Sequence, residues 1–152
     1  KMESIFIPHV AEKVVDRINH LTSDTQPQWG KMSVDQMMAH CNVPYEMVYE
    51  PQKFKRPNSF MRGVLQLLAK NIVVGDKPYK KNSRTAPDFV ISDKRNFELE
   101  KEKLIYNIRK TADLGESYFD GKESFALGKL NKKEWNNLFH KHIDHHLNQF
   151  GV

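Results

Sequence analysis

The sequence predicts an all-α protein, a four-helix bundle with one extra short helix. Apolar residues recur at spacings of three and four over four long segments and one shorter one, which is the period of an amphipathic helix. No segment shows the alternation of apolar and polar residues that is typical of a half-buried strand. The chain has 152 residues, and a domain usually contains roughly 100 to 200. We therefore expect a single helical-bundle domain over residues 1–152.

The first two helices have clear starting signals. Pro8 suits the first turn of a helix, where its missing N–H breaks no hydrogen bond. The apolar face that follows consists of Val10, Val14, Ile18 and Leu21. At the second helix, Ser33 and Gln36 form a capping-box pattern, in which each side chain binds an unpaired backbone N–H. Pro44 lies inside this second helix and removes a backbone donor, so we expect a kink or a break near Val43.

The remaining segments are less uniform. A third, shorter helix is expected at 58–73, with Gly75 as its stop. Residues 75–92 contain two prolines and a basic cluster but show no helical period, so we expect a loop that is either functional or mobile. A fourth helix is expected at 93–112. The last helix is expected at 131–150 and begins with a second capping-box pattern.

Composition narrows the class of protein. Cys41 is the single cysteine, so an internal disulfide is impossible and a disulfide-stapled secreted scaffold is excluded. No apolar run approaches the roughly 18 to 20 residues that a membrane span needs, and the first residues lack the pattern of a secretory signal. We therefore expect a cytoplasmic protein with no membrane partner.

The charge distribution bears on possible anionic partners. The formal net charge is +5, and much of the excess lies on two expected loops. These basic clusters are Lys53, Lys55 and Arg56, then Lys77, Lys80, Lys81 and Arg84. Only Phe54 and Tyr79 interrupt them, whereas a nucleic-acid-binding surface usually carries a denser basic stripe interleaved with aromatic residues. We expect solvated basic loops rather than a nucleic-acid interface.

Histidines gather on the last helix, which carries His140, His142, His145 and His146. At about 100° per residue from Trp135, His142 falls at about −20° and His146 at about +20°, in the middle of the apolar face. His145 falls at the edge of that face and His140 points away from it. A buried imidazole needs a partner, because burying an unpaired polar ring costs free energy. Two explanations remain open: a shared metal ion, as in helical His-x-x-x-His sites, or hydrogen bonds to other core side chains.

Other residues could complete a metal site. His40 lies on the Met-rich second helix, although its angle of about −120° from Val34 places it on the flank of the apolar face. Gln149 lies one turn beyond His146 and could orient a ligand or a bound water, or simply be a buried amide. Cys41 is a poor co-ligand for the ion of His40, because adjacent helical residues diverge by about 100°. A small buried hydrophobe explains Cys41 better.

Two segments carry a resemblance to a known superfamily: WGKMSVDQMMAHC, Trp29 to Cys41, and LNKKEWNNLFHKHIDHHLNQFGV, Leu130 to Val152. They resemble the DinB/YfiT-like superfamily of metal-binding four-helix bundles, and look closest to a bacterial branch of unknown function. In helix order the resemblance extends over nearly the whole chain. It implies one divalent ion held by His40, His142 and His146. Zn, Ni, Fe and Mn all accept imidazole, so the sequence does not select among them.

The resemblance also implies a chemistry. Three imidazole ligands leave at least one coordination position open, as in catalytic metal sites. An ion with an open position can lower the pKa of a water or a thiol that occupies it. Characterised members of the superfamily include thiol transferases and a thiol-dependent isomerase. The resemblance thus implies a metal-dependent thiol S-transferase or hydrolase that acts on a small-molecule substrate, and the basic residues of 75–92 would favour an anionic low-molecular-weight thiol.

A protein of a different class also fits the sequence: a non-catalytic helical-bundle interaction module whose histidines are structural. Exposed apolar faces on the first or third helix could then form a homodimer. The two hypotheses differ in metal content, because only the first predicts a stoichiometric ion that is lost when His142 is replaced.

Overall fold

The computed structural model of the protein describes residues 2–152. The helices are α1 (Pro8–Asn19), α2 (Val34–Tyr49), α3 (Ser59–Leu68), α4 (Lys70–Val74), α5 (Phe97–Leu114), α6 (Glu116–Phe119), α7 (Lys132–Asn136) and α8 (His142–Gln149), with short 3₁₀ turns at Pro51–Lys53 and Pro87–Phe89 and a π-helical turn at Asn137–Lys141. Within this part of the chain no strand forms, and one isolated bridge pairs Glu123 with Lys129. The predicted all-α class is confirmed.

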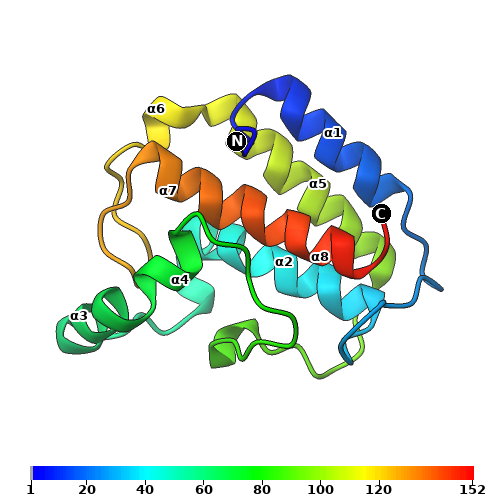
Figure 1. Ribbon diagram of the computed structural model, residues 1–152, viewed down its shortest axis with the longest axis horizontal. Coiled ribbons are helices and arrows are strands. Elements are labelled where there is room, and N and C mark those ends of the chain that lie inside the picture. The colour runs from blue at the N-terminus through cyan, green and yellow to red at the C-terminus, as the bar shows by residue number, and fades with distance from the viewer. Residues whose placement is uncertain (1) are drawn as a thin grey trace.

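Four helical segments make up the body of the protein (Figure 1). α5 packs against α1 and α2, and α8 also contacts α1 and α2, so the four enclose a common interior. Aromatic rings fill one end of that interior: Tyr45 stacks on Phe139 with ring centroids 4.7 Å apart, and Phe139 stacks on Trp135. α3 and α4 lie outside this bundle (Figure 1).

The two predicted capping boxes are present. At α2 the Ser33 N–H donates to Gln36 Oε1. At α7 the Asn131 N–H donates to Glu134 Oε1, while Asn131 Oδ1 accepts from the Glu134 N–H. These hydrogen bonds satisfy backbone donors that the first turn of a helix leaves without a partner.

Of the kink or break expected at Pro44, the break does not occur, because α2 continues through the proline to Tyr49. Val43 and Tyr45, on either side of the proline, are both buried in the core. The core packing of this stretch, which includes the Tyr45 ring stacked on Phe139, outweighs the one backbone hydrogen bond that the proline removes.

The third expected helix is divided in two. α3 ends at Leu68 and α4 begins at Lys70, with Ala69 between them. The predicted stop at Gly75 is confirmed, and a β-carbon there would lie 2.1 Å from the Asn71 carbonyl oxygen. A residue with a side chain therefore cannot end α4 in this way.

The fourth expected helix and the last one differ from the prediction in their start and in their internal geometry, respectively. α5 starts at Phe97 rather than near Asp93, because the Asn96 side chain caps it by accepting from the Leu99 N–H. The last helix is continuous over its expected length but contains the π-helical turn at Asn137–Lys141. Over residues 2–152, no helix is both long enough and apolar enough to span a membrane.

Candidate metal centre

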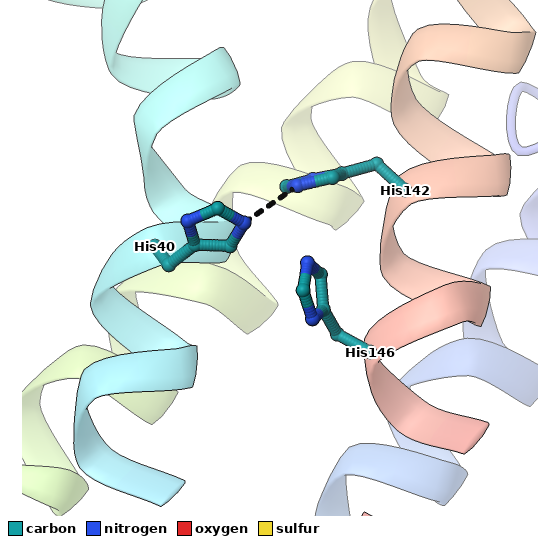
Figure 2. A group of neighbouring side chains, drawn as sticks. All are labelled: His40, His142 and His146. Carbon is teal, nitrogen blue, oxygen red and sulfur yellow. Dashed lines mark hydrogen bonds between the residues drawn. The ribbon is translucent and has the colours of Figure 1, made fainter. Parts of the chain in front are cut away.

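Three histidines from two helices meet inside the bundle (Figure 2). His40 comes from α2, and His142 and His146 come from successive turns of α8. One ring nitrogen from each lies within 4.8 Å of the other two, and the Nε2 atoms of His40 and His142 are 2.9 Å apart. The structure thus brings together the three residues that the sequence selected. His40 is 6 % exposed, so its predicted place on the flank of the helix does not keep it from the interior.

The hydrogen bonds around His40 and His146 fix which nitrogen of each ring is free. The Nδ1–H of His40 donates to the Phe89 carbonyl at 2.8 Å. The Nδ1–H of His146 donates to Gln149 Oε1 at 2.7 Å. Each ring therefore carries its proton on Nδ1 and presents an Nε2 lone pair. Such outer hydrogen bonds are typical of metal-binding histidines, because they fix the tautomer and raise the basicity of the ligand.

The orientation of the Gln149 amide is itself fixed. Its Nε2 donates to the Trp29 carbonyl at 2.9 Å, and a carbonyl can only accept. The amide oxygen must therefore face His146. Gln149 is thus a buried amide whose oxygen accepts from His146 and whose nitrogen donates to Trp29.

Burial keeps the three imidazoles neutral. It lowers the pKa of His40 and holds that of His142 well below its usual value. Burial likewise lowers the pKa of His146 to about 3, and the neighbouring ring of His40 acts in the same direction. Neutral imidazole is the form that binds a metal ion, so the cluster is in its ligating state at neutral pH.

The π-helical turn at Asn137–Lys141 joins the site to the segment that follows α4. Asn137 Nδ2 donates to the Val74 carbonyl and to Asp76 Oδ1, both at 2.9 Å. Lys141 is only 5 % exposed, and its ammonium donates to the carbonyls of Ile72, Gly75 and Lys77 at 2.7 to 3.1 Å. Desolvation lowers the pKa of Lys141. Sequence reasoning missed this residue, because a lysine between two histidines gives no signal of burial.

Two aromatic residues of the cover segment, residues 75–92, lie against the histidines. The Phe89 ring is edge-on to His40 and His142, at centroid distances of 5.6 and 6.1 Å. The Tyr79 ring is edge-on to His142 and to His145, and its hydroxyl donates to the Val73 carbonyl. The predicted loop is therefore confirmed as a loop, and it packs over the histidine cluster.

Three other residues of α2 and its C-cap that carry a thiol or a carboxylate lie apart from the site. Cys41 is fully buried, burial raises the pKa of its thiol, and its Sγ lies 3.6 Å from Met37 Sδ. This agrees with a small buried hydrophobe. Glu46 and Glu50 form ion pairs with Lys103. Their carboxylates are thus engaged by α5 rather than by the histidines.

The profile of the family described as "Protein of unknown function (DUF1569)" matches residues 3–151. The chain belongs to the DUF1569 family. Searches among curated proteins and among solved structures found no match. Membership of the DinB/YfiT-like superfamily remains a prediction.

In this DUF1569 chain a groove of about 550 Å³ lies beside the histidine cluster. Trp29, Tyr79, Lys81 and His145 line it together with Gln28, Asn148, Gly151 and Val152, and none of these residues is acidic. The Lys81 ammonium lies 4.3 Å from the centre of the Trp29 ring. Trp29 is half-buried at the end of the bundle, whereas Trp135 is in the core.

Proposed function

We propose that the protein holds one divalent transition metal, Zn, Ni, Fe or Mn, through His40, His142 and His146, with Gln149 positioning His146. The observation that carries this proposal is the pair of Nδ1 hydrogen bonds, which directs the Nε2 lone pairs of His40 and His146 into the cluster, where that of His40 accepts from His142 Nε2 at 2.9 Å. No carboxylate or thiolate joins the described cluster, so the donor set is three neutral imidazoles. Imidazole suits each of these four metals.

The spacing of the nitrogens fits this assignment. Zn–N bonds are about 2.0 to 2.1 Å long, so nitrogens on one ion lie within about 4 Å of one another. The three ring nitrogens already lie within 4.8 Å, and the closest pair is 2.9 Å apart. Small side-chain adjustments are therefore sufficient, with no rearrangement of α2 or α8.

We further propose that the site is catalytic and acts on a small molecule, either by transferring a thiol to an electrophile or by hydrolysis. Three protein ligands leave a coordination position open, in contrast to closed structural sites. A divalent ion there supplies Lewis acidity, which lowers the pKa of a water or thiol in that position. The resemblance to the DinB/YfiT-like superfamily favours a low-molecular-weight thiol as the co-substrate.

The chain's own residues have two roles in this proposal. Phe89 and Tyr79 cover the histidines and limit access of water, which strengthens electrostatic interactions inside the site. Lys81, with Lys80 and Arg84 on the same segment, gives the groove beside the site a positive charge. Such a charge attracts anionic substrates. Neutralising these three residues together should raise KM for an anionic substrate, and an unchanged KM would contradict their role.

Metal analysis tests the central claim. Protein purified without an affinity tag or chelator is examined by inductively coupled plasma mass spectrometry, alongside His142→Ala and His146→Ala. His140→Ala is the matched control, because His140 lies on the same continuous last helix but outside the cluster. We expect about one equivalent of metal in the parent and the control and none in the two variants.

The outcome also decides between the two classes of function. Metal in the parent protein justifies assays of thiol transfer and of hydrolysis with the loaded protein. Absence of metal after reconstitution with Zn, Ni, Fe and Mn would overturn the enzymatic proposal. A helical interaction module would then be the better description, and the exposed apolar face of α3 is the observation that favours it.

A further inference from the structure

α3 presents its apolar side chains to solvent. Phe60 is 79 % exposed, Leu67 83 % and Leu68 69 %, and none of the residues of this helix is buried. Ile72, in the adjoining α4, is 68 % exposed. A contiguous exposed group of large apolar residues is unusual for a monomer and marks an interaction surface. We call Phe60, Met61, Leu67, Leu68 and Ile72 the α3 face.

The apolar stripe of α3 is only partly covered: Val64 and Leu65 are half-buried, whereas Phe60, Leu67 and Leu68 are exposed. At about 100° per residue from Phe60, Val64, Leu67, Leu68 and Met61 fall within an arc of about 120°. Arg62 and Gln66 fall on the opposite side. Arg62, which is half-buried, donates to the nearby Pro57 carbonyl. Gln66 is exposed, but its side chain lies so close to Gly128 that a β-carbon there would be 2.7 Å from its Oε1.

The position of α3 makes this face accessible. α3 lies at one edge of the molecule, beyond the four packed segments (Figure 1). α4 anchors it, because α4 packs on the π-helical turn at Asn137–Lys141. The face is therefore held by the bundle but is not covered by it.

The charged residues of the segment that contains α3 indicate which kind of partner binds the α3 face. Residues 51–75 contain five basic residues and no acidic one. Three of the five are ion-paired with carboxylates elsewhere in the chain: Lys53 with Glu46 and Glu50, Arg56 with Glu123, and Lys70 with Glu134. Binding to an anionic lipid surface or to nucleic acid depends on several unpaired cations. Ion pairs thus neutralise most of the basic residues in this part of the chain, and the five residues of the α3 face itself carry no charge.

We infer that the α3 face binds the α3 face of a second copy of the chain, forming a two-fold homodimer. A two-fold contact brings the same surface of each copy together, so an apolar, uncharged stripe meets a stripe of the same character. Obligate dimers commonly bury more than about 2,000 Å². A contact built on five apolar side chains per copy is smaller, so we expect a reversible dimer. This inference is independent of the proposed metal site.

Sedimentation velocity over micromolar to millimolar concentrations tests the inference. We expect the mass to rise from that of one chain, 17.8 kDa, towards that of two. Leu67→Glu places a charge at the two-fold contact and should raise the dimer dissociation constant at least about tenfold. Leu99→Glu is the matched control, because Leu99 is 63 % exposed but lies on α5; it should leave the constant unchanged.

A cross-linking experiment locates the contact. In Leu67→Cys the engineered thiol is the one accessible to a mild oxidant, because Cys41 is buried. We expect disulfide-linked dimers for Leu67→Cys and not for Leu99→Cys. A single-chain mass at millimolar concentration would overturn the inference. So would association that Leu67→Glu leaves unchanged, and so would a monomer that co-sediments with phosphatidylglycerol vesicles, which would assign the face to lipid.

Discussion

Gln149 joins the imidazole of His146 to the backbone of Trp29. It accepts the Nδ1 proton of His146 at 2.7 Å and donates to the Trp29 carbonyl at 2.9 Å. Trp29, which lines the groove, is thus connected to His146 of the candidate metal centre through the side-chain amide of Gln149 alone. This link makes the role of Gln149 testable apart from that of the histidines.

Replacing Gln149 by Leu should lower metal affinity by about 10- to 100-fold, because His146 loses the acceptor that fixes its tautomer. Gln149→Glu keeps an acceptor for the Nδ1–H and should lose less. Competition with a chromophoric chelator measures both. Equal affinity in the parent and Gln149→Leu would show that Gln149 does not position His146.

The buried ammonium of Lys141 should contribute strongly to stability. Lys141→Met leaves the carbonyls of Ile72, Gly75 and Lys77 without their donor. A lost charged hydrogen bond in a buried setting costs about 1.5 to 3 kcal/mol, so we expect a loss of at least about 2 kcal/mol in urea unfolding. Lys133→Met, whose ion pair with Asp76 is exposed, should change the unfolding free energy by less than about 1 kcal/mol. Similar losses in the two variants would contradict the assigned role.

The stability of the metal-free protein should fall in mild acid. Burial lowers the pKa of His142 and His146 in the folded state, so below the ordinary histidine pKa of about 6.5 the unfolded chain binds more protons. The contribution of these histidines to the free energy of unfolding should therefore be constant above about pH 7 and decrease as the pH falls from about 6.5 towards 3, by up to about 1.4 kcal/mol per pH unit for each histidine.

Urea titrations at several pH values in the presence of a chelator measure this dependence. His146→Gln removes one of the shifted groups and should reduce the slope. An unfolding free energy that does not change between about pH 7 and 5 would show that the histidines are not held neutral by burial.

Cys41 should resist thiol reagents in the folded protein. It is 1 % exposed, and burial raises the pKa of its thiol. A reagent therefore cannot reach the sulfur, and the reactive thiolate is not formed at neutral pH. Reaction with a disulfide reagent should follow global unfolding and accelerate in urea. Rapid labelling of the native protein would contradict the burial of Cys41 and would also require a cysteine-free background for the cross-linking of Leu67→Cys.

The sequence could predict the parts of the site that lie on one helix. The spacing of His142 and His146 determines that their side chains share a face, and both residues belong to the regular turns of α8. The capping boxes at Ser33 and Asn131 located the starts of two helices for the same reason, because capping is a local interaction. The place of His40 could not be obtained from its angle alone, since the partner across the bundle decides what is buried.

Non-local interactions account for the differences from expectation. Nothing near Pro44 in the sequence shows that packing carries α2 through it. The Lys141 site depends on the end of α4, which is about 65 residues away along the chain. The apolar period of α3 was visible, but the period does not tell whether its face turns inward or outward.

The Phe89 carbonyl, as the acceptor of the His40 Nδ1 proton, couples the cover segment to the interior. If a ligand of His40 Nε2 binds more tightly when this hydrogen bond is formed, thermodynamic reciprocity requires that the bound ligand favours the formed hydrogen bond, and with it the closed segment, by the same factor. Residues 75–92 therefore act as a reporter of occupancy. Their amide hydrogens should exchange more slowly, and the Arg84 peptide bond should be cut more slowly by trypsin, as the three histidines become loaded.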